Sequence, residues 1–159
     1  AHIALSEMEK KGKLKAVITQ NIDGLHQSAG SKNVLELHGS TLRNYCISCK
    51  KFFNIDYMNN KSTDWPVCDE CGAMVKPDVV LYEEGLDEYI VDKSVEAISN
   101  AEMLIIGGTS LTVFPAANLI RYFKGKYLVL INKTETQADS YADLVIHDSI
   151  GETLGKIKI

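Results

Sequence analysis

Residues 102–108 read EMLIIGG, an apolar segment that ends in two glycines. Its apolar residues are consecutive rather than alternating, a pattern typical of a strand that is covered on both faces, as in a parallel sheet. Similar segments rich in β-branched residues occur at 15–19, 78–82, 127–132 and 142–147. We expect each of these five segments to form a strand.

Helical patterns lie between the expected strands, at about 87–100, at 115–124 with Pro115 in the first turn, and near 150–157. Strands that alternate with helices favour βαβ units, so the predicted fold class is α/β, with a doubly wound, mostly parallel Rossmann-like sheet. Another helical pattern covers residues 1–12 but has no N-cap or initiator methionine before it. We therefore expect the chain to begin inside a domain.

Composition and charge disfavour two classes of partner. The 159 residues are 45% hydrophobic, enough for a globular domain with a core. A net charge of −4 provides no basic field to attract nucleic acid or an anionic membrane. No apolar run approaches the roughly 20 residues that span a bilayer, and no signal sequence is recognisable. We expect a cytoplasmic protein.

Residues 40–77 interrupt the alternation and predict a small inserted module. Cys46, Cys49, Cys68 and Cys71 form two CxxC pairs separated by 18 residues, a spacing typical of a zinc site. Four thiolates complete a tetrahedral shell and leave no position for a reacting water, so the predicted site is structural. Two disulfides or four free thiols are the alternatives, although a cytoplasmic chain keeps its thiols reduced.

The charges of this module argue against nucleic-acid binding, a common role of zinc ribbons. Four of its basic residues are offset by four acidic ones: Arg43, Lys50, Lys51 and Lys61 against Asp56, Asp64, Asp69 and Glu70. We therefore expect no nucleic-acid partner.

Polar side chains follow the first expected strand, at the sheet edge where doubly wound folds bind their ligands. Gln20 and Asn21 offer amide groups suited to ribose hydroxyls or a carboxamide, and Asp23 can accept from an amide. The same residues could form only a turn, in which Asn and Asp cap their own backbone. On local sequence alone these two interpretations are equally good.

Two further strand ends carry similar groups. Gly108, Thr109 and Ser110 follow residues 102–108 and would let a ligand approach the backbone closely. Asn132 and Lys133 end the strand at 127–132 and could hold an adenosine ribose, although a solvated loop would have the same composition. Three polar strand ends along one sheet edge favour a ligand site.

His38 lies between Leu37 and Gly39, close to the predicted zinc module. An isolated histidine is more often a core or loop residue than a catalyst. Its position downstream of a possible ribose site nevertheless makes His38 a candidate general base near neutral pH.

Several segments, in this order, resemble the sirtuin family of NAD-dependent protein-lysine deacylases: TQNIDGLHQSAG, LELHGS, the two CxxC pairs, KPDVVLYEE, GGTSLTVFPAA and LVLINK. The resemblance covers nearly the whole chain. It implies a Rossmann-like NAD-binding domain at 1–39 and 78–159, incomplete at its N-terminus, with a zinc-binding subdomain inserted at 40–77. An acyl-lysine protein or peptide would bind in the cleft between the two.

The resemblance also implies the reaction and the role of each residue. The acyl oxygen attacks C1′ of the nicotinamide ribose, and the products are free lysine, nicotinamide and O-acyl-ADP-ribose. His38 matches the base, and three sets match the NAD contacts: Gln20, Asn21 and Asp23 around the nicotinamide and its ribose; Gly108, Thr109 and Ser110 on the nucleotide backbone; Asn132 and Lys133 at the adenosine end. The peptide would add as a strand between Val79, Val80, Leu81 and Tyr82 on one side and Val113 and Phe114 on the other.

Two departures from the family pattern stand out. The usual Phe-Gly-Glu after the substrate strand is Tyr82-Glu83-Glu84 here. The upstream glycine-rich segment, with G-A-G-x-S and P-D-F-R, is absent, so we expect this chain alone to be inactive or nearly so, while the intact protein would be an enzyme. A non-catalytic zinc-ribbon binding module and a different NAD-consuming ADP-ribosyl transferase are the alternative functions.

Overall fold

The computed structural model describes residues 1–60, 65–114 and 116–158. Three residues named above, Lys61, Asp64 and Pro115, lie outside the described residues. The chain divides into two compact units. Unit 1 comprises Ala1–Ile18, Leu25–Leu35 and Asp87–Ile159, and unit 2 comprises Thr19–Gly24 and Glu36–Leu86. The division passes through strands β1 (Val17–Thr19) and β2 (Val34–Glu36), which form a two-stranded sheet.

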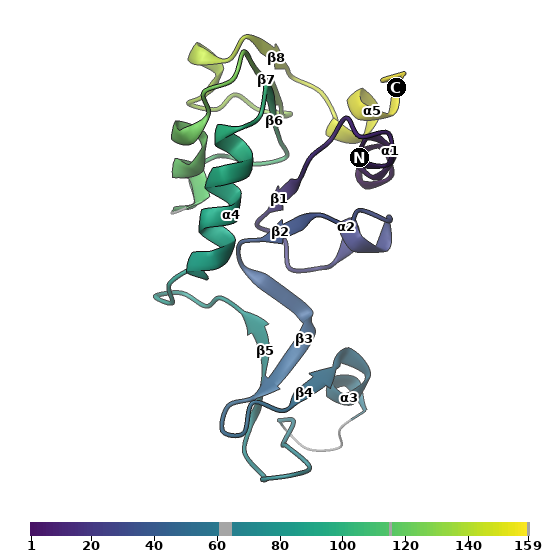
Figure 1. The fold of residues 1–159 in the computed structure, drawn as a ribbon, viewed down its shortest axis with the longest axis vertical. Coiled ribbons are helices and arrows are strands. Elements are labelled where there is room, and N and C mark those ends of the chain that lie inside the picture. Colours follow the sequence, from purple (N-terminus) through teal and green to yellow (C-terminus); the bar gives the residue numbers. More distant parts are fainter. Residues whose placement is uncertain (61–64, 115, 159) are drawn as a thin grey trace. The chain divides into compact units, whose positions relative to one another are not determined.

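A parallel sheet forms the centre of unit 1 (Figure 1). Its strands are β6 (Met103–Gly107), β7 (Tyr127–Ile131) and β8 (Leu144–Ile146), in that order. They confirm the strands expected at 102–108 and 127–132 and, over a shorter length, at 142–147. The register pairs Gly107 with Ile131, so the carboxyl ends of β6 and β7 lie at the same edge.

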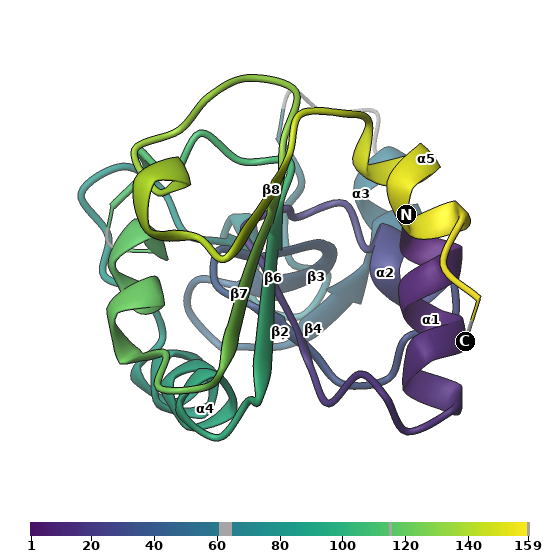
Figure 2. The same ribbon diagram turned by 90° about the horizontal axis from the view of Figure 1, so that it is seen from above.

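Helices cover both faces of this sheet, as Figure 2 shows. On one face, α1 (His2–Lys10) and α5 (Ile150–Gly155) pack a core in which Met8, Ile131 and Leu154 are buried. The other face is covered by α4 (Glu88–Ser99). Because successive strand residues point to opposite faces, a strand between two helical layers is apolar at consecutive positions. The expected doubly wound α/β fold is confirmed.

The remaining elements of unit 1 are short. Helix α2 spans Leu25–Ser28, and the 3₁₀ helices η1 and η2 span Ala116–Tyr122 and Asp139–Tyr141. We expected an ordinary helix at 115–124 and did not expect α2. Helix α4 closely matches the helix expected at about 87–100. It begins after Asp87, because Asp87 Oδ1 accepts a hydrogen bond from the Ile90 N–H at 3.1 Å and caps the first turn.

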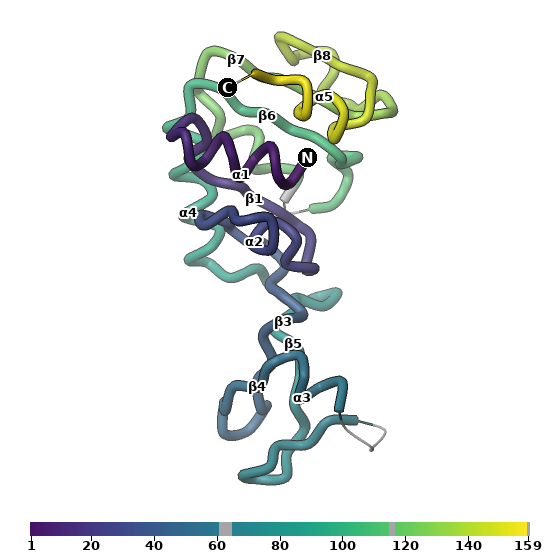
Figure 3. The backbone as a smooth tube through the Cα atoms, turned by 90° about the vertical axis from the view of Figure 1, so that its right-hand side faces the viewer, coloured from purple at the N-terminus to yellow at the C-terminus, as the bar shows by residue number. Residues whose placement is uncertain are grey.

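Unit 2 is built on an antiparallel sheet in the order β4-β3-β5. Strand β3 spans Gly39–Cys46, β4 Phe52–Asn54 and β5 Val75–Val79, and helix α3 spans Ile55–Asn59. Figures 1 and 3 show β3 and β5 side by side. The strand expected at 78–82 is therefore wrong in its bounds and in its sheet, because residues 75–79 pair with β3 and the chain turns after them.

The described part of the chain contains no helix with the length and apolar character of a membrane span.

Candidate functional site

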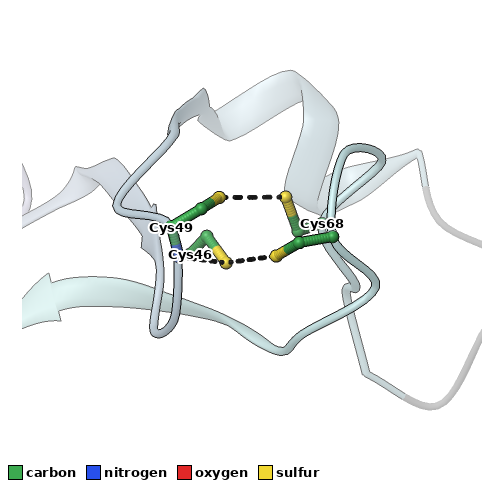
Figure 4. A group of neighbouring side chains, drawn as sticks. Cys46, Cys49 and Cys68 are labelled. Carbon is green, nitrogen blue, oxygen red and sulfur yellow. Dashed lines mark hydrogen bonds between the residues drawn. The ribbon is translucent and has the colours of Figure 1, made fainter.

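The four cysteines converge on one point in unit 2. Cys46 ends β3 and Cys49 lies in the loop after it, whereas Cys68 and Cys71 belong to the loop before β5. Their sulfur atoms all lie within 4.8 Å of one another. In Figure 4 the side chain of Cys49 points toward that of Cys68. Two chain segments separated by 18 residues therefore supply one cluster of four soft donors.

This donor set fits zinc. The Sγ atoms of Cys46 and Cys71 are 3.4 Å apart, and those of Cys49 and Cys68 are 3.6 Å apart. Tetrahedral ligands at zinc–sulfur distances of about 2.3 Å would lie about 3.8 Å from one another. A disulfide would need about 2.05 Å, so all four cysteines are free thiols. The alternative of two disulfides is excluded.

The pKa values of Cys46 and Cys49 shift in opposite directions. Burial opposes ionisation of Cys46, but the backbone N–H groups of Cys49 and Ser48 and the neighbouring thiols lower its pKa to about 6. The N–H of Lys51 lowers the pKa of Cys49, but burial and the sulfurs of Cys46 and Cys71 outweigh it and raise that pKa to about 12. Cys46 therefore ionises more readily than Cys49.

His38 is held in one orientation by a backbone carbonyl. Its Nδ1 lies 3.1 Å from the Gln20 carbonyl oxygen. Since a carbonyl can only accept, we assign the proton of the neutral ring to Nδ1, which leaves the lone pair on Nε2. The ring can then accept a proton at Nε2 from a hydroxyl that comes within hydrogen-bond reach.

The loop that carries Gln20, Asn21 and Asp23 is fixed by hydrogen bonds to the segment around His38. The Leu37 N–H donates to the Thr19 carbonyl at 2.9 Å, and the Thr41 N–H donates to the Ile22 carbonyl at 3.0 Å. The Asn21 N–H bonds the Thr19 hydroxyl at 3.1 Å. These three candidate residues and His38 therefore belong to one part of unit 2.

The side-chain amide of Gln20 has a hydrogen-bond donor that a ligand could satisfy. Its Nε2 is buried, and within the described part of the chain it has no hydrogen-bond partner. A buried donor without an acceptor costs free energy comparable to that of a lost hydrogen bond. A ribose hydroxyl or a carboxamide oxygen would satisfy it, so the residues present fit a nicotinamide nucleotide.

The segment expected to bind peptide adjoins His38 directly. The Val80 N–H donates to the His38 carbonyl at 3.1 Å, and Gly39 pairs with Val79 across β3 and β5. Leu81 and Tyr82 follow the strand and are exposed. His38 and the Val79–Tyr82 segment are thus joined by main-chain hydrogen bonds.

Arg43 forms ion pairs with two carboxylates near His38 and the end of β5. It was not identified as a site residue from the sequence. Its Nη1 lies 2.6 Å from a carboxylate oxygen of Glu36, and its Nε lies 2.9 Å from one of Asp78. Burial opposes the charge of Arg43, but both carboxylates raise its pKa overall. The guanidinium links the segment that leads to His38 with the end of β5. The pairing of β3 with β5 brings Arg43 close to Asp78, whereas Glu36 belongs to β2.

Gly39 stands where a side chain cannot fit. Its φ is +73°, and a Cβ there would overlap the Asp78 carbonyl. We expect Gly39→Ala in the full-length protein to lower the free energy of unfolding by at least about 2 kcal/mol, because the left-handed backbone and the clash both oppose alanine. Urea denaturation measures this change. The control is Gly85→Ala, since Gly85 has open space around it; stability of Gly39→Ala equal to that control would contradict the prediction.

In unit 1 the loop that carries Gly108, Thr109 and Ser110 lies at the carboxyl end of β6. The Gly108 N–H donates to the Ile131 carbonyl at 3.2 Å, and Gly108 has a φ of +64°. The Thr109 hydroxyl accepts from the Leu111 N–H at 3.2 Å, and the hydroxyls of Ser110 and Thr112 are 2.7 Å apart. These bonds order the loop beside the end of β7.

Asn132 and Lys133 follow β7 at this same edge. Asn132 Nδ2 donates to the Thr134 carbonyl at 2.9 Å. The His147 ring lies with Nδ1 3.2 Å from the Asn132 carbonyl oxygen and Nε2 3.1 Å from Asp139 Oδ2.

Val113 and Phe114 are not in a strand. Both side chains are exposed, and the Val113 carbonyl accepts from the Ala117 N–H at 2.9 Å at the start of η1. The structure therefore brings the candidate residues together as two sets. Unit 2 contains His38, the 19–24 loop, residues 79–82 and the cysteines. Unit 1 contains Gly108–Ser110, Val113, Phe114, Asn132 and Lys133.

Comparisons with known proteins point to one family. The profile described as "Sir2 family" matches residues 1–115. The chain is 64% identical over 154 residues to an NAD-dependent protein deacetylase of Clostridium acetobutylicum and 63% identical over 158 residues to one of Clostridium perfringens. These matches cover 97% and 99% of the chain. The chain spans only 63% and 64% of the length of these two curated relatives.

A solved structure described as "Sir2-p53 peptide-NAD+" has the same fold. Its TM-score is 0.90 at 39% sequence identity, and the match covers 97% of this chain and 66% of that one.

Proposed function

Because the chain belongs to the Sir2 family, we propose that the full-length protein is an NAD-dependent protein-lysine deacylase. It transfers the acyl group of an acyl-lysine side chain to ADP-ribose and releases nicotinamide. The observation that carries the proposal is the imidazole of His38 fixed by the backbone carbonyl of Gln20, a residue whose side-chain amide is buried and unsatisfied. A base and a ribose or carboxamide ligand meet there.

His38 acts as the general base. The Gln20 carbonyl keeps the proton on Nδ1, so that Nε2 can take a proton from a ribose hydroxyl. Breaking the glycosidic C–N bond develops positive charge on the ribose, so the site must hold the sugar and the acyl oxygen in line and exclude water. The role of His38 is to advance the transfer once nicotinamide has left.

The remaining candidate residues bind the two substrates. Gln20, Asn21 and Asp23 contact the nicotinamide and its ribose; Gly108, Thr109 and Ser110 contact the nucleotide backbone; Asn132 and Lys133 contact the adenosine end. The acyl-lysine peptide pairs with Val79, Val80, Leu81 and Tyr82 and with the segment at Val113 and Phe114. The NAD-binding domain comprises 1–39 and 78–159, and the zinc subdomain comprises 40–77.

Cys46, Cys49, Cys68 and Cys71 hold a structural zinc ion, which has no part in the chemistry because four thiolates fill its coordination shell. Four thiols without disulfides suit a reducing compartment, and we place the protein in the cytoplasm on that ground.

The test is incubation of the full-length protein with NAD and an acetyl-lysine peptide. We expect nicotinamide release that depends on the peptide, with O-acetyl-ADP-ribose and free lysine identified by mass spectrometry. Attachment of ADP-ribose to protein would instead indicate a transferase. No nicotinamide release from a zinc-loaded, folded protein would favour a binding module.

A further inference from the structure

A tight turn follows strand β5 in unit 2. The Glu84 N–H donates to the Leu81 carbonyl at 3.1 Å, which closes a four-residue turn. The third residue of this turn, Glu83, has a φ of +72°. That position in a turn favours glycine, because a Cβ makes the left-handed conformation unfavourable. Glutamate persists there only if its surroundings hold the turn.

Two side chains hold this turn, and we name the pair Lys76 and Glu84 the clasp. Lys76 Nζ lies 3.2 Å from Glu84 Oε2 and donates to the Val79 carbonyl at 3.1 Å. Glu84 Oε2 also accepts from the Leu81 N–H at 2.8 Å. That N–H first, and Lys76 second, lower the pKa of Glu84, so the carboxylate is the form that closes the clasp.

The clasp fixes the backbone on both sides of Val80. The Val80 N–H itself donates to the His38 carbonyl at 3.1 Å. The main-chain bond to His38 therefore holds Val80 itself, and the clasp ties the Val79 carbonyl and the Leu81 N–H that flank Val80. Together they leave Tyr82, whose side chain is fully exposed, at the open end of the segment.

We propose that Lys76 and Glu84 are positioning residues for the peptide substrate. This inference rests on the proposed function, in which the Val79–Tyr82 segment pairs with the acyl-lysine peptide. A strand that is ordered before its partner arrives loses less conformational entropy on binding. The clasp supplies that order where the sequence places glutamate rather than glycine at position 83.

The test uses Glu84→Gln in the full-length protein, with nicotinamide release as the assay. We expect the KM for an acetyl-lysine peptide to rise about fivefold, because the variant loses charge-assisted bonds to Lys76 and Leu81. The kcat and the KM for NAD should stay within about twofold. The matched control is Glu96→Gln, which breaks another exposed Lys–Glu pair, Lys93 with Glu96 on α4.

Rescue by Glu83→Gly separates this role from a simple charge effect. Glycine adopts the positive φ without help, so the double variant Glu83→Gly/Glu84→Gln should restore the peptide KM to within about twofold of the wild type. Hydrogen exchange at the backbone amide of residue 84, measured without substrate, should quicken in Glu84→Gln and slow again in the double variant.

An unchanged peptide KM in Glu84→Gln would overturn the inference, and so would a raised KM that Glu83→Gly does not restore. In both cases the wild type still releases nicotinamide. Absence of nicotinamide release from the wild type would overturn the proposed function instead. Hydrogen exchange at the amide of residue 84 would then show separately whether the clasp orders the turn.

Discussion

Replacing His38 with alanine in the full-length protein should lower kcat for deacylation by about 10²- to 10⁴-fold, the range expected for loss of a general base. The structure supports this expectation, because the Gln20 carbonyl directs Nδ1 and leaves Nε2 to accept a proton. Steady-state nicotinamide release with a saturating acetyl-lysine peptide measures the change.

His2→Ala is the control for this variant. The His2 ring packs edge-on against His26, at 4.5 Å between ring centroids, in unit 1, and its loss should leave kcat within about twofold. Binding of NAD to His38→Ala, followed by calorimetry, should remain, because the base acts after binding. A kcat of His38→Ala equal to that of the control would remove His38 from the mechanism.

Removing zinc from the full-length protein should unfold the cysteine-bearing end of unit 2. The hydrophobic cluster around the site contains four buried residues, within the described part of the chain, and two of them are the ligands Cys46 and Cys68. Phe53 and Val75 are the others. Structural zinc contributes about 10–16 kcal/mol in zinc-finger peptides, far more than two buried side chains supply.

Metal analysis and hydrogen exchange test this prediction together. The native protein should contain about one zinc ion per chain, and a chelator should remove it and abolish amide protection in β3, β4 and β5. Cys68→Ser should behave like the chelated protein. Asp69→Asn is the control, because Asp69 pairs with Lys51 and offers no sulfur. Full protection in the metal-free protein would show that the module folds without zinc.

The architecture of unit 1 could be predicted because its signals are local. Consecutive apolar residues marked β6 and β7, since each strand lies between two layers of helices. The CxxC spacing marked the metal ligands for a similar reason, because a short turn brings two sulfurs together whatever surrounds it. Within unit 2, the strands β3 and β4 were missed, because the module has few periodic apolar residues and is organised by pairing around the cysteines.

The sequence by itself therefore determined the α/β class, the zinc ligands and the family. Only the tertiary structure decided that β5 ends at Val79, that Gln20 orients His38, and that Arg43 joins Glu36 to Asp78. The physical reason is that these features depend on hydrogen bonds between atoms distant in the chain, which no local pattern of residues specifies.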